Sequence, residues 1–268
     1  AGEISGFLGI AYDISERKRR EAYTEHIAHH DHLTGLPNRV LLHDRLGAAL
    51  LRARKAGGAV AALMVDLDHF KRINDSLGHF VGDELLRIVS QRLQRCVRTG
   101  DTVARMGGDE FVVLLADIKD VGAVERVARE IINRVAEPVE IGGHELLVSA
   151  SAGVSLYPND ARDTEALLKH ADTAMYEAKA AGRHAYRMFS PEMGRRAAVT
   201  MELESALRRA LASEELQIHY QPQICLRTGT IEGIEALMRW TDPQHGVVSP
   251  TQFIAVAEQT GLIVALGE

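Results

Sequence analysis

The chain has 268 residues, of which 46% are hydrophobic and 25% charged, and its formal net charge is −6. These proportions are ordinary for a soluble globular protein, and the length exceeds that of a typical single domain. The negative balance argues against a surface that coats nucleic acid, although a few local Lys and Arg residues can still hold phosphates. No apolar stretch approaches the roughly 18–20 residues that a membrane span needs.

The two cysteines and the start of the chain bear on location. Cys96 and Cys225 lie far apart and outside any C-x-x-C pattern, which argues against a disulfide scaffold or a zinc site. This usage fits a reducing compartment, so we expect a cytoplasmic protein. The chain has no start Met and no signal peptide, which predicts a piece of a longer protein. Membrane contact is expected only through parts of that parent outside this chain.

The first 39 residues combine an apolar strand pattern, a charged helix pattern and a turn. Residues 6–14 are predicted to form a strand, and residues 15–29 a helix whose charged run suits a solvated face. Ser15 can cap the start of this helix. A glycine and a proline within residues 31–39 end it.

From residue 39 to residue 189, helix and strand patterns alternate. Apolar stripes at helical spacing predict helices at 39–56, 82–98, 121–136 and 164–180. Apolar runs predict strands at 59–65, 102–105, 111–115, 147–156 and 185–187. This alternation predicts an α/β domain whose central sheet is faced by helices.

The pattern changes after residue 190. A helix is predicted at 199–212, followed by strands at 216–221 and 231–238 around a turn at 227–229. These elements predict the beginning of a second domain. The residues that remain are far too few for a large barrel.

The first chemistry-bearing segment is Val65-Asp66-Leu67-Asp68. Alternation along a strand sends Asp66 and Asp68 to one side and Leu67 to the other. Two carboxylates at the carboxyl end of a buried strand suit Mg²⁺, which prefers oxygen ligands and bridges to substrate phosphates. Two solvated turn carboxylates are the alternative.

The second segment is the run Gly107-Gly108-Asp109-Glu110-Phe111 between two strand patterns. It predicts a hairpin in which the glycines allow positive φ and let the backbone approach a ligand closely. Two successive carboxylates beside such a turn can serve as metal ligand and proton acceptor. A bare hairpin turn is the alternative, although Asp-Glu leading straight into an apolar strand is unusual for it.

Six motifs in register resemble the GGDEF-domain diguanylate cyclases over about residues 27–189. They are the Gly107–Phe111 run, Asp66-x-Asp68-x-Phe70-Lys71-x-x-Asn74-Asp75, Gly78-His79, Gly82-Asp83, Asp31-x-Leu33-Thr34-Gly35-Leu36-x-Asn38-Arg39 and Ala178-Lys179-x-x-Gly182-Arg183. The resemblance implies a nucleotidyl-cyclase-like α/β (α+β) fold with a mostly antiparallel central sheet. It also implies that two GTP molecules are condensed into cyclic di-GMP with release of pyrophosphate.

The resemblance assigns the metal and catalytic roles. Asp66, Asp109 and the Leu67 carbonyl would hold two Mg²⁺ (or Mn²⁺) ions per GTP. Asp109 or Glu110 would help deprotonate the attacking 3′-hydroxyl, and the choice between them stays open. 

Substrate binding is assigned in the same way. Asn74 and Asp83 would read the guanine edge, with helix capping as their alternative role. The cations Lys71, Lys179 and Arg183 would neutralise the phosphates. The remaining predicted substrate-binding residues are Phe70, Gly107 and Gly108.

Each such domain holds one GTP, so catalysis would require a homodimer, controlled by the charged helix before residue 30. Arg98 and Asp101 match the family's R-x-x-D inhibitory site, which binds the product cyclic di-GMP. Capping the end of a helix is their alternative role. Arg129 would assist from another face or subunit, with a solvated helix position as its alternative.

The flanks resemble two further families. Residues 1–14 resemble the end of a PAS sensor domain, and 15–30 a signalling helix. Residues 31–189 form the predicted cyclase domain, 190–200 a linker, and 201–268 the N-terminal fragment of an EAL phosphodiesterase, a TIM-like barrel. In that fragment Gln221 lies in a matching motif, Glu235 would bind metal and Arg239 phosphate. Without most of its strands this barrel cannot close, so no phosphodiesterase activity is expected of the fragment.

Two functions from different classes remain. The first is an active, product-inhibited cyclase in a sensor-regulated PAS–GGDEF–EAL protein. The alternative is a GTP-binding regulatory module that activates the attached EAL domain. The intact carboxylates favour catalysis.

Overall fold

The computed structural model describes residue 16 and residues 27–213, 215–244 and 246–267. Contacts between residues divide the chain into two units, and the boundary in the sequence lies between Pro191 and Glu192. The predicted PAS strand and most of the predicted signalling helix lie outside the described residues. Among the described residues, no helix is both long and apolar enough to cross a membrane.

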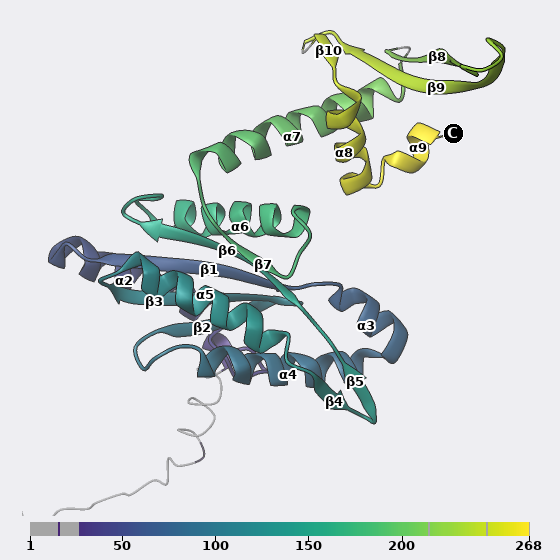
Figure 1. The fold of residues 1–268 in the computed structure, drawn as a ribbon. Coiled ribbons are helices and arrows are strands. Elements are labelled where there is room, and N and C mark those ends of the chain that lie inside the picture. The colour runs from purple at the N-terminus through teal and green to yellow at the C-terminus, as the bar shows by residue number, and fades with distance from the viewer. Residues whose placement is uncertain (1–15, 17–26, 214, 245, 268) are drawn as a thin grey trace, which may run out of the picture. The chain divides into compact units, whose positions relative to one another are not determined.

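The first unit is built on a sheet with the strand order β2-β3-β1-β6-β7 (Figure 1). The strands are β1 (Ala59–Leu67), β2 (Thr102–Gly107), β3 (Glu110–Ile118), β6 (Ala150–Tyr157) and β7 (Ala185–Met188). The β2–β3, β3–β1 and β1–β6 pairs are antiparallel, and only β6–β7 is parallel. The predicted α/β fold with a mostly antiparallel sheet faced by helices is confirmed.

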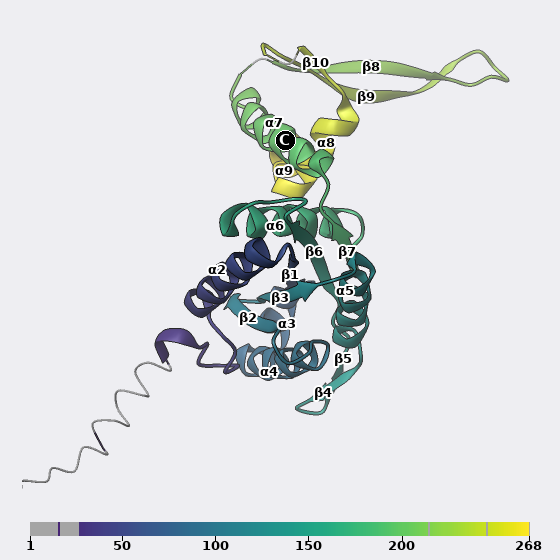
Figure 2. The ribbon, with the colours of Figure 1, turned by 90° about the vertical axis from the view of Figure 1, so that its left-hand side faces the viewer.

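Helices cover both faces of this sheet, as Figure 2 shows. They are α2 (Arg39–Ala56), α3 (Phe70–Leu77), α4 (His79–Arg95), α5 (Val121–Val135) and α6 (Thr164–Ala180). The central strand β1 is buried on both faces: Leu63 and Val65 pack with α4 and α5, while Ala62 and Met64 pack with α2 and α6. Strand alternation therefore places Asp66 on the same face as α6.

Several predicted boundaries were wrong. Helix α3 was not predicted, and α4 begins at His79 rather than at residue 82, because Gly78 allows a new helix to begin directly after α3 with φ at 87°. The strand predicted at 147–156 begins only at Ala150. Residues before it form a separate hairpin of β4 (Val139–Ile141) and β5 (His144–Leu146). The Gly142-Gly143 turn, with φ of 60° and 82°, is the signal that predicts it.

The second unit contains α7 (Pro191–Ala210), β8 (Leu216–Ile224), β9 (Ile231–Asp242), β10 (Gly246–Val248), α8 (Pro250–Thr260) and α9 (Ile263–Gly267). Its strands form an antiparallel sheet in the order β10-β9-β8. In its core the rings of Trp240 and Phe253 pack edge to face, with their centroids 5.7 Å apart. Helix α7 begins at Pro191, before the predicted start at residue 199, because proline is well tolerated in the first helical turn. The predicted linker at 190–200 is therefore helical.

Candidate functional site

The candidate active site begins with two carboxylates on neighbouring strands. Asp66, near the end of β1, lies directly opposite Glu110, the first residue of β3. Lys179 of α6 reaches this pair, and its Nζ lies 2.8 Å from Asp66 Oδ1. The predicted residues Asp66, Glu110 and Lys179 are thus brought together by three different elements.

The approach of α6 to the sheet depends on a missing side chain. A Cβ at Gly153 of β6 would lie 2.0 Å from the Ala171 carbonyl oxygen and 2.0 Å from the Met175 nitrogen. These are backbone atoms of α6 and cannot move aside. Only glycine therefore lets α6 pack this closely, and the close packing carries Lys179 to the Asp66 carboxylate.

The charge balance at Asp66 favours cations. Burial raises the pKa of the Asp66 carboxyl; the Lys179 ammonium opposes this, and the nearby Asp109 and Glu110 carboxylates raise the pKa further. Within the described part of the chain, no three His, Cys, Asp or Glu side chains gather closely enough to hold an ion alone. Mg²⁺ usually takes one or two carboxylates and completes its shell with water and substrate phosphates. The set of Asp66, Asp109 and the Leu67 carbonyl fits that pattern.

The hairpin between β2 and β3 carries Asp109 and Glu110. Gly107 and Gly108 have φ of 137° and 54°, values that favour glycine, so the positive φ predicted for these two glycines is confirmed. Glu110 is exposed and Asp109 half-buried. Both carboxylates are accessible to a ligand.

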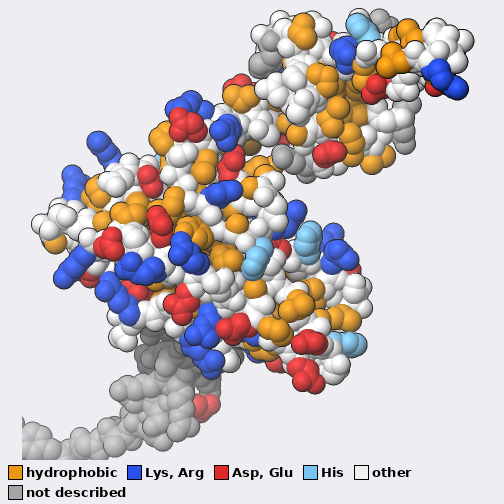
Figure 3. All heavy atoms as spheres, in the orientation of Figure 1, with side chains coloured by type: hydrophobic (Ala, Val, Ile, Leu, Met, Phe, Trp, Pro, Cys, Tyr) orange, Lys and Arg blue, Asp and Glu red, His pale blue; other side chains and the backbone are white. Residues whose placement is uncertain are grey.

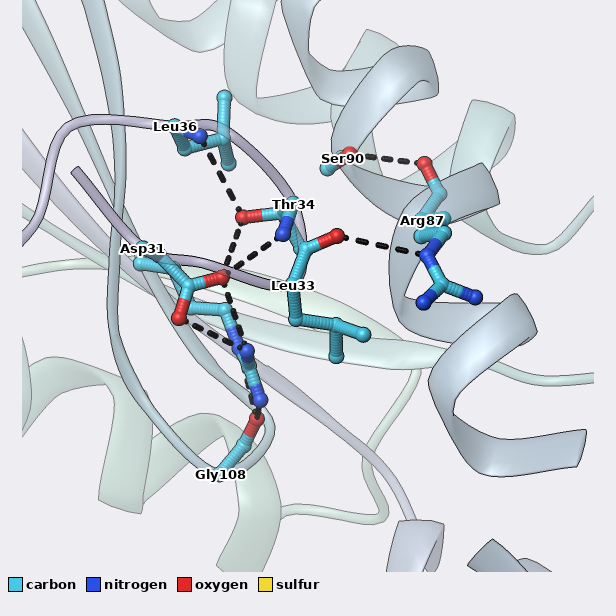
Figure 4. Close-up of polar contacts among 8 residues, drawn as sticks. Asp31, Leu33, Thr34, Leu36, Arg87, Ser90 and Gly108 are labelled. Atoms are coloured by element: carbon cyan, nitrogen blue, oxygen red, sulfur yellow. Dashed lines mark hydrogen bonds and ion pairs between the residues drawn. The ribbon is translucent and has the colours of Figure 1, made fainter. Parts of the chain in front are cut away.

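An ion pair anchors this hairpin to the start of the domain. Arg105 of β2 contacts both oxygens of Asp31 through Nη1, at 2.9 and 3.0 Å. Its Nη2 donates to the Gly108 carbonyl at 2.7 Å, so the hairpin turn and Asp31 lie at opposite ends of one guanidinium (Figure 4). Thr34 donates to Asp31 through its backbone N–H and its hydroxyl, at 2.9 and 2.6 Å. Sequence reasoning gave Asp31 and Arg105 no role, because residues so far apart show no pattern that pairs them.

A cavity of 220 Å³ lies beside the carboxylates. It brings together all six of the predicted phosphate and metal residues, which come from the end of β1, the start of α3, the β2–β3 hairpin, and the end of α6 with the turn after it. Its lining consists of Asp66, Leu67, Asp68, His69, Phe70, Lys71, Asp109, Lys179 and Arg183. With three cations at its wall, the cavity suits a polyphosphate.

Asn74 and Asp83 do not line that cavity; they lie on α3 and on the first turns of α4. Neither caps these helices, because backbone groups of Gly78 end α3 and no side chain caps α4. The capping alternative is therefore wrong. Asn74 Oδ1 is buried and has no hydrogen-bond partner among the residues that the structure describes. A Cβ at Gly82 would lie 1.9 Å from this oxygen, so Gly82 makes the room that the Asn74 carboxamide occupies.

The predicted inhibitory residues are only partly brought together. Arg98 and Asp101 line a second cavity, of 300 Å³, with Cys96 and Lys119 among its other wall residues. Arg98 donates to the Ala116 carbonyl at 2.7 Å, and Asp101 accepts the Ala116 N–H at 3.2 Å, so both brace β3. Arg129 does not line this cavity.

In the second unit, Gln221 and Glu235 lie directly opposite each other on β8 and β9. Both are exposed, while Arg239, four residues further along β9, is half-buried. The register of β8 and β9 therefore places the predicted residues Gln221 and Glu235 next to each other. Most of the β8 side chains are exposed.

Another cavity, larger than the two above, was not predicted. It measures 680 Å³ and lies on the face of the sheet covered by α2 and α6, where it adjoins Glu110. Its polar wall residues include Arg39, His43, Lys169 and Asp172. Burial raises the pKa of Asp172, and Lys179 opposes this rise. Two helices separated by more than 100 residues build this wall, so no local sequence pattern marks it.

Comparison with known families matches residues 28–185 to "Diguanylate cyclase, GGDEF domain" and residues 204–268 to "EAL domain". The chain belongs to the GGDEF-domain family and carries the beginning of an EAL domain.

The chain is similar to the bifunctional diguanylate cyclase/cyclic di-GMP phosphodiesterase MucR of Pseudomonas aeruginosa, with 44% identity over 242 residues, 90% of this chain and 35% of the relative. It is 42% identical over 255 residues to the cyclic di-GMP phosphodiesterase PdeR of Escherichia coli, which covers 95% of this chain and 38% of that protein. The chain thus spans little more than a third of these two relatives.

Solved structures agree with this assignment. The GGDEF domain of TpbB (YfiN) from Pseudomonas aeruginosa is 40% identical, with a TM-score of 0.62 over 63% of this chain and 99% of that chain. The coiled coil and GGDEF domain of DgcB from Caulobacter crescentus, solved in complex with c-di-GMP, is 25% identical, with a TM-score of 0.59 over 66% of this chain and 93% of that chain.

Proposed function

We propose that the first unit is a diguanylate cyclase that condenses two GTP molecules into cyclic di-GMP and two pyrophosphates. The observation that carries the proposal is the Asp66–Glu110 pair, set on adjacent strands beside a cavity lined by three cations. Carboxylates crowded together in this way, with Asp66 buried, need positive charge. A metal–nucleotide complex supplies it and places a phosphate chain in the cavity.

The reaction forms two phosphodiester bonds. In each, the ribose 3′-oxygen of one GTP attacks the α-phosphorus of the other, and the bond from that phosphorus to the departing pyrophosphate breaks. The proton of the 3′-hydroxyl passes to Glu110 or Asp109. Lys71, Lys179 and Arg183 hold the phosphates by charge-assisted hydrogen bonds.

Asp66, Asp109 and the Leu67 carbonyl would hold two Mg²⁺ or Mn²⁺ ions per GTP. Such ions would supply positive charge to stabilise the attacking and leaving oxygens. Asn74 and Asp83 hold the guanine by its hydrogen-bonding edge, the amide offering a donor and an acceptor and the carboxylate accepting from the ring N–H groups. Phe70, Gly107 and Gly108 complete the substrate site.

The first unit of each copy of the chain holds one GTP, so we propose that the first units of two copies face each other as a homodimer during catalysis. Cyclic di-GMP then acts as product and inhibitor, with Arg98, Asp101 and a partner's Arg129 as its site. Basic and acidic side chains are interspersed over the visible face of the first unit (Figure 3), so that face offers no continuous basic surface to nucleic acid. GTP as substrate supports a cytoplasmic location.

We propose 31–189 as the cyclase domain and 201–268 as the start of an EAL domain, in which Gln221, Glu235 and Arg239 belong to an incomplete phosphodiesterase site. The parent would be a PAS–GGDEF–EAL protein. The matched ranges 28–185 and 204–268 support both domain assignments.

A second function is favoured by one observation: a relative 42% identical to this chain is a cyclic di-GMP phosphodiesterase by name. In that case the first unit binds GTP and activates the EAL half without turnover. Incubating the chain with GTP and Mg²⁺ and measuring cyclic di-GMP by chromatography separates the two. Product formation that rises with the square of chain concentration supports the dimeric cyclase. GTP binding without product, in a sample shown to be dimeric, supports the regulatory module.

A further inference from the structure

The second carboxylate after β1, Asp68, is held by several donors. It is only 5% exposed. Its Oδ1 accepts the Ser151 hydroxyl at 2.7 Å, and its Oδ2 accepts the Ser149 hydroxyl at 2.6 Å and the His184 N–H at 3.2 Å. A carboxylate with these donors in place is anchored within the protein rather than available to an ion.

These donors come from two separate parts of the fold. The serines stand at the start of β6, whereas His184 belongs to the turn between α6 and β7. The Asp68 backbone N–H also donates to the Ser149 carbonyl, at 2.9 Å. Asp68 therefore joins the end of β1, the start of β6 and the turn at residues 182–184.

The backbone of that turn adopts a conformation that is unfavourable for residues other than glycine. Arg183 and His184 have φ of 63° and 47°, two successive residues in the left-handed region. Such conformations cost on the order of 1–3 kcal/mol each and persist where the surroundings hold them. The His184 N–H bond to Asp68 is a contact that holds this turn from another strand.

Arg183 is the residue of this turn that reaches the 220 Å³ cavity, where it lies with Lys71 and Lys179. The backbone conformation at 183 and 184 decides where its guanidinium is carried. We propose that Asp68 is a positioning residue: it holds the 182–184 turn in its left-handed conformation, so that Arg183 faces the phosphates of the bound nucleotide. This inference rests on the proposed GTP site.

The test measures the Kd of GTP with its α,β-bridging oxygen replaced by methylene, by calorimetry with Mg²⁺ on the full chain. Asp68→Asn keeps the side-chain shape and loses the charge; it is expected to weaken binding about tenfold, as Arg183→Ala is, because each removes one charge-assisted phosphate contact. The double variant Asp68→Asn/Arg183→Ala is expected to bind no more weakly than Arg183→Ala alone. Multiplied effects, about a hundredfold, would overturn the proposal.

A matched control separates positioning from general loosening. Asp160 at the other end of β6 also accepts a backbone N–H, from Leu156 at 2.7 Å. Asp160→Asn is expected to leave the Kd within twofold. If Asp68→Asn does not fold, Ser149→Ala removes one donor to the same carboxylate and is expected to raise the Kd about threefold. An unchanged Kd in whichever of Asp68→Asn and Ser149→Ala is folded would also overturn the positioning role of Asp68. So would a variant that needs more Mg²⁺ but binds the nucleotide with the same Kd.

A second measurement works without nucleotide. Hydrogen exchange at the His184 amide is expected to be at least tenfold faster in Asp68→Asn than in the parent chain, while exchange in the centre of β3 stays unchanged. Equal exchange rates at His184 would reject the proposal. If the parent chain binds no nucleotide but the exchange difference is present, the proposed function fails and the hold on the turn stands.

Discussion

Arg105 and Asp31 are 74 positions apart in the sequence, yet the guanidinium Nη1 lies 2.9 Å from the carboxylate. Their side chains are only 10% and 14% exposed. The pair ties the start of the first unit to the hairpin that carries Asp109 and Glu110. Its integrity is therefore expected to matter for stability and for turnover.

Replacing Asp31 by Asn is expected to lower the free energy of unfolding by about 3 kcal/mol, because it leaves a nearly buried guanidinium without its counter-charge. Cyclic di-GMP formation should fall as the Gly108 turn loosens. Urea denaturation measures the first effect and product chromatography the second. Glu130→Gln, which removes an exposed ion pair with Arg134, serves as control and should cost less than about 1 kcal/mol.

The same pair predicts a pH dependence. Burial acts to raise the pKa of Asp31, but hydrogen bonds from Thr34 and Arg105 outweigh it and hold the pKa below its ordinary value of 3.8. A folded-state pKa below the unfolded value gives stability that is complete above the unfolded pKa and lost as pH falls through the folded one. The stability gap between the parent chain and Asp31→Asn should be constant from pH 7 to about 5 and shrink below pH 3.8. A gap that stays constant down to pH 3 would contradict this.

Asp66→Asn is expected to have opposite effects on stability and on function. Since burial and neighbouring carboxylates raise the pKa of Asp66, its ionised form is disfavoured in the folded state. A neutral residue relieves this and should raise the melting temperature of the nucleotide-free chain by about 2 °C. GTP-dependent turnover should be lost because the ion site loses a ligand. Thermal melts with and without Mg²⁺-GTP measure both, and an unchanged ligand-induced shift would count against the site.

Gly82→Ala is expected to raise the KM for GTP by tenfold or more, with a smaller change in kcat. The new Cβ would lie 1.9 Å from Asn74 Oδ1 and drive the carboxamide away from its position. Losing one buried hydrogen-bonding partner of the base accounts for that magnitude. Gly47→Ala in α2, where a Cβ meets open space, is the matched control and should stabilise by about 0.5–1 kcal/mol without affecting KM.

Arg98→Ala is expected to raise the inhibition constant for cyclic di-GMP about tenfold, since its guanidinium is largely exposed and keeps donors that can pair with a product phosphate. The side chain of Arg98 is 65% exposed, whereas that of Asp101 is 5% exposed and already accepts backbone N–H groups. Initial rates without product should stay within twofold. Unchanged inhibition would reject Arg98 as part of the product site.

Much of this fold and site follows from sequence pattern because the signals are local. Alternation and buried apolar runs predict β1 and β3, and the Gly107–Phe111 run predicts the hairpin. The contacts that align them do not: Asp31 with Arg105, Asp68 with His184, and Gly153 with Ala171 join residues with no shared periodicity. The D-x-D pattern does not separate Asp66 from Asp68; in the fold both line the cavity, but only Asp68 accepts two serine hydroxyls and a backbone N–H.

The absence of a side chain at Gly153 separates two kinds of constraint on this chain. A Cβ there would lie 2.0 Å from helix backbone, so any other residue pushes α6 off the sheet, whether or not the protein has work to do. Lys179 projects from that same helix, and its ammonium pairs with Asp66. A history of selection for folding alone would fix position 153 and let position 179 drift. Selection for nucleotide chemistry would fix both, so variation at these two positions tells the two histories apart.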